Sequence, residues 1–137
     1  MDDPLDFKER LVTILDAEVA PGGWNQQHKV IGIEPAGADD FELLIQVLPE
    51  GMHPIEMLDS FIAPMNWVGI GVIAFGWASP PCDRPSQHAE RKRVRCTTFV
   101  WRDGDITSTA ALDDGTVIDQ PGTGGVINAM TECLARS

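Results

Sequence analysis

Apolar and polar residues follow a strand-like pattern between positions 94 and 118. Three short runs of apolar or β-branched residues are separated there by Asp103-Gly104 and Asp114-Gly115. Asp-Gly pairs readily adopt the positive φ values of two-residue type I′ turns, so the pattern predicts a β-meander of three antiparallel strands. The rest of the predicted sheet is arranged around this meander.

Two-residue turns would also fix which residues face one another across the meander. Trp101 would lie opposite Ile106, and Leu112 opposite Val117. One face would then carry Phe99, Trp101, Ile106 and Leu112, and the other would be small and rich in threonine. We expect the first face to be the core side and the second to be half-exposed or covered by a helix.

Helical periodicity marks the N-terminal segment. Asp3-Pro4 supplies a capping residue followed by proline at the first helical position. Apolar residues then recur at Phe7, Leu11 and Ile14, at the spacing of one helix face. The helix should end near Ala20, because a Pro-Gly-Gly sequence follows.

Three further segments have the composition of strands. Residues 29–34 form a short apolar run, and residues 41–48 alternate over a length that favours a strand over two turns of helix. Residues 67–78 are all apolar or glycine, which suits a central strand covered on both faces. Gly69 and Gly71 would share a face that a helix could approach closely.

The remaining segments complete the predicted order. His53-Pro54 opens a helix over residues 53–63, residues 80–90 form a proline-rich loop, and an apolar stripe over residues 126–134 predicts a last helix. The order is α-β-β-α-β-β-β-β-α, without a domain boundary in residues 1–137. It describes a single α+β domain with helices packed on a largely antiparallel sheet of about five to six strands.

Composition points to a cytoplasmic protein with one core. A chain of 137 residues can form such a core without disulfides, and its three cysteines are widely spaced and odd in number. The acidic N-terminus does not resemble a secretory signal. No charged residue occurs from Ser60 to Cys82, but prolines and glycines interrupt this stretch, so we expect a sheet core and no membrane span.

The formal net charge of −11 argues against nucleic-acid binding, because affinity for phosphates comes from clustered Lys and Arg. One basic cluster occurs at Arg91, Lys92, Arg93 and Arg95. Its simplest interpretation is a solvated strand start, and the alternative is a local site for an acidic partner.

No residues form a recognisable catalytic or metal-binding motif. Cys82 and His88 lack a second Cys or His pair at the spacing of a zinc site. The glycine-rich residues 121–125 contain neither the Walker lysine nor the GxGxxG spacing, and Thr123 is interpreted as a helix cap. We therefore expect no metal, no cofactor and no catalytic residue, and we favour a non-enzymatic function.

Aromatic residues concentrate on the predicted central strands, where Trp67, Phe75 and Trp77 would share a strand face. The simpler interpretation is a core, and the alternative is an exposed stripe that docks another protein or a small apolar ligand. The candidate binding surface consists of Trp67, Trp77, His88, Arg95, Phe99 and Trp101.

Three stretches carry a family resemblance. They are Ala20-Pro21-Gly22-Gly23-Trp24, Gly76-Trp77-Ala78 before the proline-rich loop, and His88 to Arg95 leading into Trp101-Arg102-Asp103-Gly104. With the Asp-rich and tyrosine-free composition, they resemble a family of small uncharacterised actinobacterial proteins that also occur in actinobacteriophages. The resemblance implies a soluble, cytoplasmic single domain and supplies no catalytic or binding residues.

Two hypotheses about function follow. The first is a soluble, non-enzymatic protein–protein interaction module that acts through the sheet edge, the loop at residues 80–90 or an exposed aromatic patch. Its expected partner is another protein, and a homo-oligomer is a further option. The alternative is a small-ligand-binding protein or enzyme with a pocket between the helix at residues 53–63 and the sheet, lined by Trp67, Trp77, Phe99 and Trp101.

Overall fold

The computed structural model describes residues 4–37, 40–78, 89, 91–118 and 125–135. The helices are α1 (Pro4–Val19), α2 (Pro54–Ser60) and α3 (Gly125–Ala135), with a single 3-10 turn, η1 (Ala20–Gly22), after α1. The strands are β1 (Lys29–Pro35), β2 (Phe41–Val47), β3 (Gly69–Ala78), β4 (Lys92–Trp101), β5 (Ile106–Leu112) and β6 (Val117–Ile118). The order along the chain is the predicted one, and the α+β class is confirmed.

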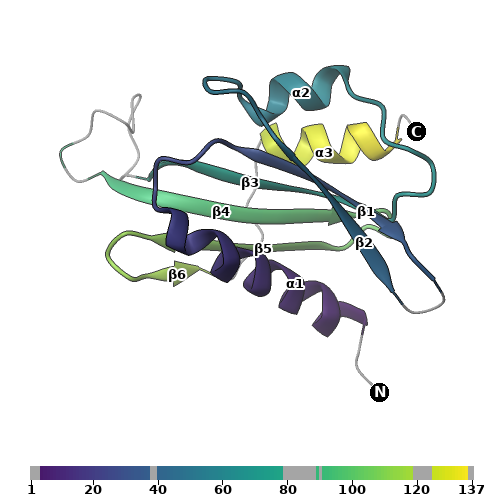
Figure 1. The fold of residues 1–137 in the computed structure, drawn as a ribbon, viewed down its shortest axis with the longest axis horizontal. Coiled ribbons are helices and arrows are strands. Elements are labelled where there is room, and N and C mark those ends of the chain that lie inside the picture. The colour runs from purple at the N-terminus through teal and green to yellow at the C-terminus, as the bar shows by residue number, and fades with distance from the viewer. Residues whose placement is uncertain (1–3, 38–39, 79–88, 90, 119–124, 136–137) are drawn as a thin grey trace.

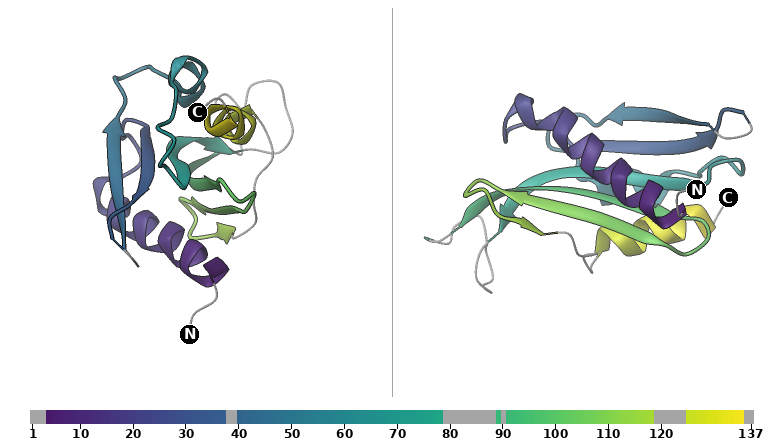
Figure 2. Two further views of the ribbon diagram at one scale, coloured as in Figure 1. Left: turned by 90° about the vertical axis from the view of Figure 1, so that its right-hand side faces the viewer. Right: turned by 90° about the horizontal axis from the view of Figure 1, so that it is seen from below.

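The strands form one antiparallel sheet with the spatial order β2-β1-β3-β4-β5-β6. Figure 1 shows α1 crossing one side of this sheet, and Figure 2 shows α2 and α3 together on the other side. The molecule therefore has three layers. Because β3 lies inside the sheet between two helical layers, it is the central strand that we predicted. Its residues 69–73 are buried, whereas residues 74–77 are half-buried.

Each face of the sheet has its own hydrophobic core. On the α1 side, Val12 and Leu15 of the helix pack against strand residues that include Ile31, Ile73 and Phe99. The core on the α2 and α3 side contains Val30, Leu48, Leu58, Ala63, Trp67, Ile70, Val72, Val100, Ala129, Met130, Cys133 and Leu134. The sheet thus contributes side chains of alternating positions to two separate cores, so our prediction of one core is wrong.

Aromatic rings occupy the space beside the glycines of the central strands. A Cβ atom on Gly71 would lie 2.3 Å from the ring of Phe99, and one on Gly32 would lie 2.3 Å from the ring of Trp67. Our prediction that a helix approaches Gly69 and Gly71 is therefore wrong, because side chains of neighbouring residues already fill this space.

The first Asp-Gly turn of the meander differs from the predicted type. The N–H of Gly104 donates to the carbonyl of Trp101, and the N–H of Trp101 donates to the carbonyl of Asp105. Gly104 has a φ of 101°, whereas every non-glycine residue that the structure describes has a negative φ. This is a three-residue loop with a glycine bulge, and Asp103 supports it by accepting the N–H of Asp105 at 3.0 Å.

The second Asp-Gly turn is built in the same way, so both predicted registers are wrong by one residue. Val100 pairs with Ile106, and Ala111 pairs with Val117. A shift of one residue moves a side chain to the opposite face of a sheet. Ile106 therefore packs in the α2 and α3 core, while Trp101 packs in the α1 core.

The second helix is shorter than predicted, since α2 ends at Ser60 and Phe61 already has an extended backbone. Pro64 disfavours a helical conformation at Ala63, which explains why the last predicted turn does not form. The helix begins where predicted, and the Nδ1 atom of His53 accepts the N–H of Ile55 at 3.2 Å.

Candidate functional site

Three of the predicted surface aromatics are buried. Trp67 is 7% exposed on the α2 and α3 side, whereas Phe99 and Trp101 are 0% and 3% exposed on the α1 side. The core interpretation of these residues is confirmed. Because they lie on opposite faces of the sheet, they cannot line the common pocket that we predicted next to the helix at residues 53–63.

Trp67 also does not share a strand face with Phe75. It precedes β3 and packs on the α2 and α3 side, while Phe75 packs on the α1 side. Trp77 is half-buried near the end of β3, where the guanidinium groups of Arg91 and Arg93 lie 4.8 Å and 4.2 Å from its ring centre. His88 lies outside the described residues.

Arg95 is not available as a surface binding residue. Its guanidinium makes two hydrogen bonds to the carboxylate of Asp16, from Nε at 2.5 Å and from Nη2 at 3.0 Å. The side chain is 7% exposed and lies 5.1 Å from the ring centre of Trp24. Arg95 therefore fixes α1 to β4 as one half of a buried ion pair.

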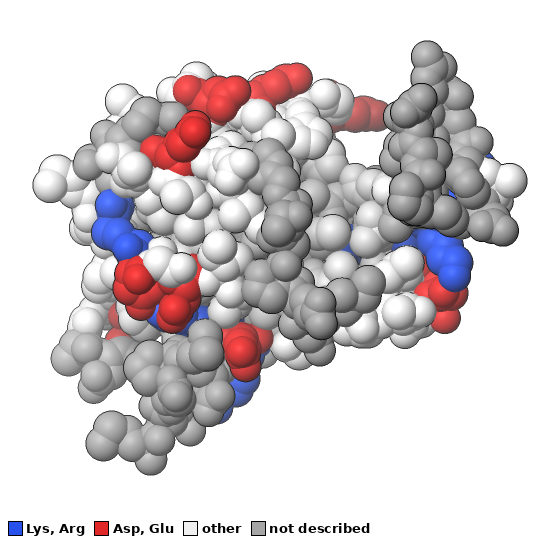
Figure 3. Space-filling view, turned by 180° about the vertical axis from the view of Figure 1, so that it is seen from behind, with Lys and Arg blue, Asp and Glu red and all other residues white. Residues whose placement is uncertain are grey.

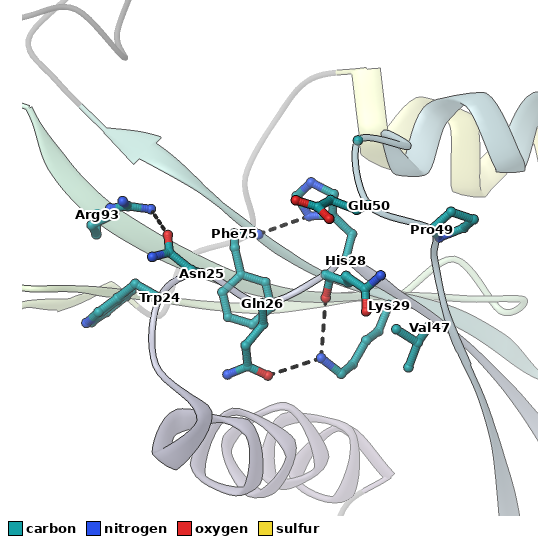
Figure 4. A pocket seen from close by; sticks show the side chains of 12 residues that line it. Trp24, Asn25, Gln26, His28, Lys29, Val47, Pro49, Glu50, Phe75 and Arg93 are labelled. Carbon is teal, nitrogen blue, oxygen red and sulfur yellow. Dashed lines mark hydrogen bonds between the residues drawn. The ribbon is translucent and has the colours of Figure 1, made fainter.

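A polar groove of about 770 Å³ opens where η1 leads into β1 (Figure 4). It is lined by Trp24, Asn25, Gln26, Gln27, His28, Lys29, Val47, Pro49, Glu50, Gly51, Phe75 and Arg93. These residues come from the loop before β1, from the end of β2 and the turn after it, and from the neighbouring strands β3 and β4. Sequence reasoning missed this groove, because its segments are far apart in the chain.

Two cations in the groove bond to neutral groups. Lys29 donates to the side-chain oxygen of Gln26 at 3.2 Å and lies 5.3 Å from the ring centre of Phe75. Arg93 donates from its guanidinium to the amide oxygen of Asn25 at 2.6 Å. Desolvation by burial lowers the pKa of Lys29. Among the described residues, neither cation has a carboxylate in salt-bridge contact.

His28 lies at the inner side of this groove. Its Nδ1 atom accepts the backbone N–H of Phe75 at 3.2 Å, and its ring centre lies 5.9 Å from that of His53. Burial, followed by the charges of His53 and Lys29, lowers the pKa of His28. The hydrogen bond and the lowered pKa both favour the neutral imidazole.

Away from the groove, several basic side chains have acidic neighbours, whereas Arg102 donates to the backbone carbonyls of Trp67 and Leu134. Lys8 bonds Asp105 at 2.8 Å and also Asp103, and Lys92 bonds Asp114. In Figure 3, the blue side chains at both ends of the molecule lie beside red ones, and the upper edge carries red side chains without blue ones. The face in this view therefore has no broad basic surface among its described residues.

Cys96 does not have the environment of an activated nucleophile. Burial, and to a smaller extent the charge of Asp16, raises the pKa of its thiol. A raised pKa decreases the thiolate fraction at neutral pH, and the thiolate is the reactive form.

The edge strand β2 carries a run of exposed apolar side chains. Phe41, Leu44, Ile45 and Val47 are 44%, 39%, 53% and 44% exposed, although all are large and apolar. β2 is the terminal strand of the sheet, and it lies at the outer edge of the ribbon in both views of Figure 2. Single exposed apolar residues are common, but a run of them along an edge strand is unusual, because such an edge can pair with another chain.

The backbone of β2 also presents hydrogen-bonding groups to solvent. The N–H of Leu48 donates to the carbonyl of His28, and the N–H of Ala36 donates to the carbonyl of Asp40. Because alternate residues of an antiparallel strand face the neighbouring strand, the even-numbered residues of β2 bond to β1 and the odd-numbered ones point outward. The outward groups belong to Phe41, Leu43, Ile45 and Val47.

The sheet edges differ in their protection. β6 has only two residues, and short edge strands are one way in which proteins prevent unwanted pairing. β2 has seven residues, contains no Lys or Pro, and carries a single charge at Glu42. We predicted this strand from the sequence. Its large apolar residues on both faces are the sequence signal that could have indicated contacts beyond its own sheet. Its place at the edge was not visible from the sequence.

No family model, curated protein or solved structure matches the chain. The resemblance to small actinobacterial proteins therefore stays a prediction. Within the described ranges, no three His, Cys, Asp or Glu side chains are grouped so that they could hold a metal ion. The helices described here are all too short or too polar to cross a bilayer.

Proposed function

We propose that the protein is a cytoplasmic, non-enzymatic protein–protein interaction module whose binding surface is the outer edge of β2. The observation that carries this proposal is the combination of exposed apolar side chains and outward backbone groups on one edge strand. A partner strand that pairs with β2 would satisfy the backbone groups and cover the side chains at the same time.

The side chains beside β2 extend this surface on the α1 side. The ring of Phe7 in α1 stacks on Phe41 with 5.4 Å between the ring centres. Leu11 and Ile14 follow Phe7 on the same helix face, and Ile14 is 55% exposed. A partner can therefore contact both the strand edge and this face of the helix.

The experiment compares Ile45→Lys with the matched control Ile62→Lys. Both isoleucines are exposed, at 53% and 68%, but Ile62 lies between α2 and β3. Each change should alter the free energy of unfolding by less than about 0.5 kcal/mol, because the side chains are at the surface. Lysine on an edge strand opposes strand pairing.

The immobilised full-length chain is incubated with lysate of the organism that encodes it, to which untagged chain has been added. A partner, either another protein or the untagged chain, should be retained by the wild type and by Ile62→Lys but not by Ile45→Lys. Retention that is equal on all three proteins, or no retention by the wild type, would contradict the proposal.

A second candidate function is binding of a small anion with a planar ring in the groove. Lys29 and Arg93 favour it, because neither has a carboxylate in salt-bridge contact among the described residues, and the ring centre of Phe75 lies 5.3 Å from the ammonium of Lys29. Benzoate should shift the resonances of Phe75 and lose this effect in Arg93→Gln, whereas neutral benzamide should have little effect. Equal shifts with both compounds would contradict this function.

A further inference from the structure

From the edge of β2 we infer that the partner strand is β2 of a second copy, paired antiparallel about a two-fold axis at Leu44. This inference rests on the proposed function and names the partner of the same surface. Such pairing requires that the sequence of β2 be complementary to itself when it is read in the reversed direction about its central residue.

The pattern of β2 is symmetric about Leu44. Pairing of Leu44 with its copy would place Phe41 opposite Val47 and Leu43 opposite Ile45, so that every such pair is apolar. All four side chains lie on the α1 side of the sheet, because Ile31 pairs with Ile45 and Ile33 with Leu43. A two-fold axis perpendicular to the sheet keeps them on one side, and they would form a continuous apolar row.

The backbone has the matching alternation. Leu44 bonds to β1, so Leu44 and its copy would form a pair without mutual hydrogen bonds. Leu43 and Ile45 point outward and would exchange hydrogen bonds across the axis, as would Phe41 and Val47. In the single chain, the carbonyl of Val47 accepts the side-chain amide of Gln46 at 3.1 Å, and the partner's N–H would replace this bond.

Charge does not oppose this register. Glu42 is the only charged residue of β2, and it would lie opposite Gln46 of the second copy. The two Glu42 residues would be about 14 Å apart, which exceeds the Debye length of about 8 Å at physiological salt. The net charge of −11 on each chain repels at longer range, so association should strengthen when salt is added.

The first test measures the mass of the purified chain by sedimentation equilibrium over a range of micromolar concentrations. The wild type and Ile62→Lys should approach twice the monomer mass as concentration rises, and Ile45→Lys should stay at the monomer mass. A wild type that is monomeric throughout overturns the inference, as does a dimer that persists in Ile45→Lys.

The second test determines the register by disulfide formation in a Cys82→Ser background. Leu44→Cys should form a cross-linked dimer on mild oxidation, because directly opposed residues without mutual hydrogen bonds have Cα atoms about 4.5 Å apart. The control Glu42→Cys should not cross-link, because its two copies would be about 14 Å apart. Cross-linking that is as efficient at position 42 as at position 44 overturns the register.

The two proposals can fail separately. If the purified chain is monomeric but a different protein is retained from lysate by the wild type and lost from Ile45→Lys, the edge of β2 is a binding surface and the second copy is not its partner. If nothing binds the edge in either experiment, both proposals are wrong.

Discussion

Replacement of Asp16 by Asn should destabilise the protein strongly, although Asp16 belongs to no candidate binding surface. The change removes the negative charge that faces the guanidinium of Arg95 but keeps the size of the side chain. Arg95 would then remain a buried cation without a counter-charge. Removal of one partner from a buried ion pair typically costs about 3–5 kcal/mol.

The exposure of the two groups sets the expected magnitude. The side chain of Arg95 is 7% exposed, but that of Asp16 is 18% exposed, so water can partly replace the lost carboxylate. We therefore expect a loss of about 3 kcal/mol in the free energy of unfolding, at the lower end of that range. For a chain of this size the melting temperature should fall by about 10 °C.

Urea denaturation followed by tryptophan fluorescence measures this loss. Asp59→Asn is the control, since Asp59 lies exposed on α2. The double variant Asp16→Asn with Arg95→Met should be more stable than Asp16→Asn alone, because it no longer buries an unpaired charge. If Asp16→Asn costs no more than Asp59→Asn, or if the second change brings no recovery, the account of this ion pair is wrong.

Three further predictions concern two glycines and the half-buried His28. Gly71→Ala should lower the free energy of unfolding by about 2 kcal/mol, because the added Cβ would overlap the ring of Phe99. The control Gly76→Ala on the same strand should be nearly neutral, because nothing lies within 4 Å of its added Cβ. Equal urea midpoints for the two variants would contradict this prediction. Gly104→Val should cost more than about 1 kcal/mol in thermal unfolding, because a β-branched residue resists the φ of 101°, and an unchanged melting temperature would contradict the bulged turn. Folding lowers the pKa of His28 below its unfolded value of 6.5. The stability that neutral His28 contributes is therefore present above pH 6.5 and is lost as the pH falls through the folded pKa. His28→Asn should make urea midpoints less dependent on pH below 6.5, and an unchanged pH dependence would contradict the assignment.

Much of the fold could be predicted because its signals are local. Pro4 and Pro54 begin helices, the apolar run of β3 identifies a central strand, and the alternation of β2 identifies a strand. The register of the meander could not be obtained in this way. Asp103-Gly104 is compatible with a two-residue turn and with a three-residue bulged loop, and the structure has the second.

The candidate site was less predictable, because it depends on contacts between distant segments. Asp16 and Arg95 are 79 positions apart, so the sequence alone did not show this ion pair, and we interpreted Arg95 as part of a solvated strand start. The exposure of Ile45 depends on β2 lying at the end of the strand order, which is a property of the whole sheet. We placed the candidate surface on strands that are rich in aromatic residues, and the structure buries most of these residues in the two cores.

The unequal lengths of the two sheet edges limit how far strand addition can proceed. An open filament requires two adhesive edges on each molecule, so that every added copy offers a new one. Here β6 has two residues and β2 has seven, so β2 is the longer of the two terminal strands in the described part of the sheet. Pairing through β2 uses this edge on both molecules. The assembly is then closed after a single step, and a chain with an apolar edge can associate without forming fibres.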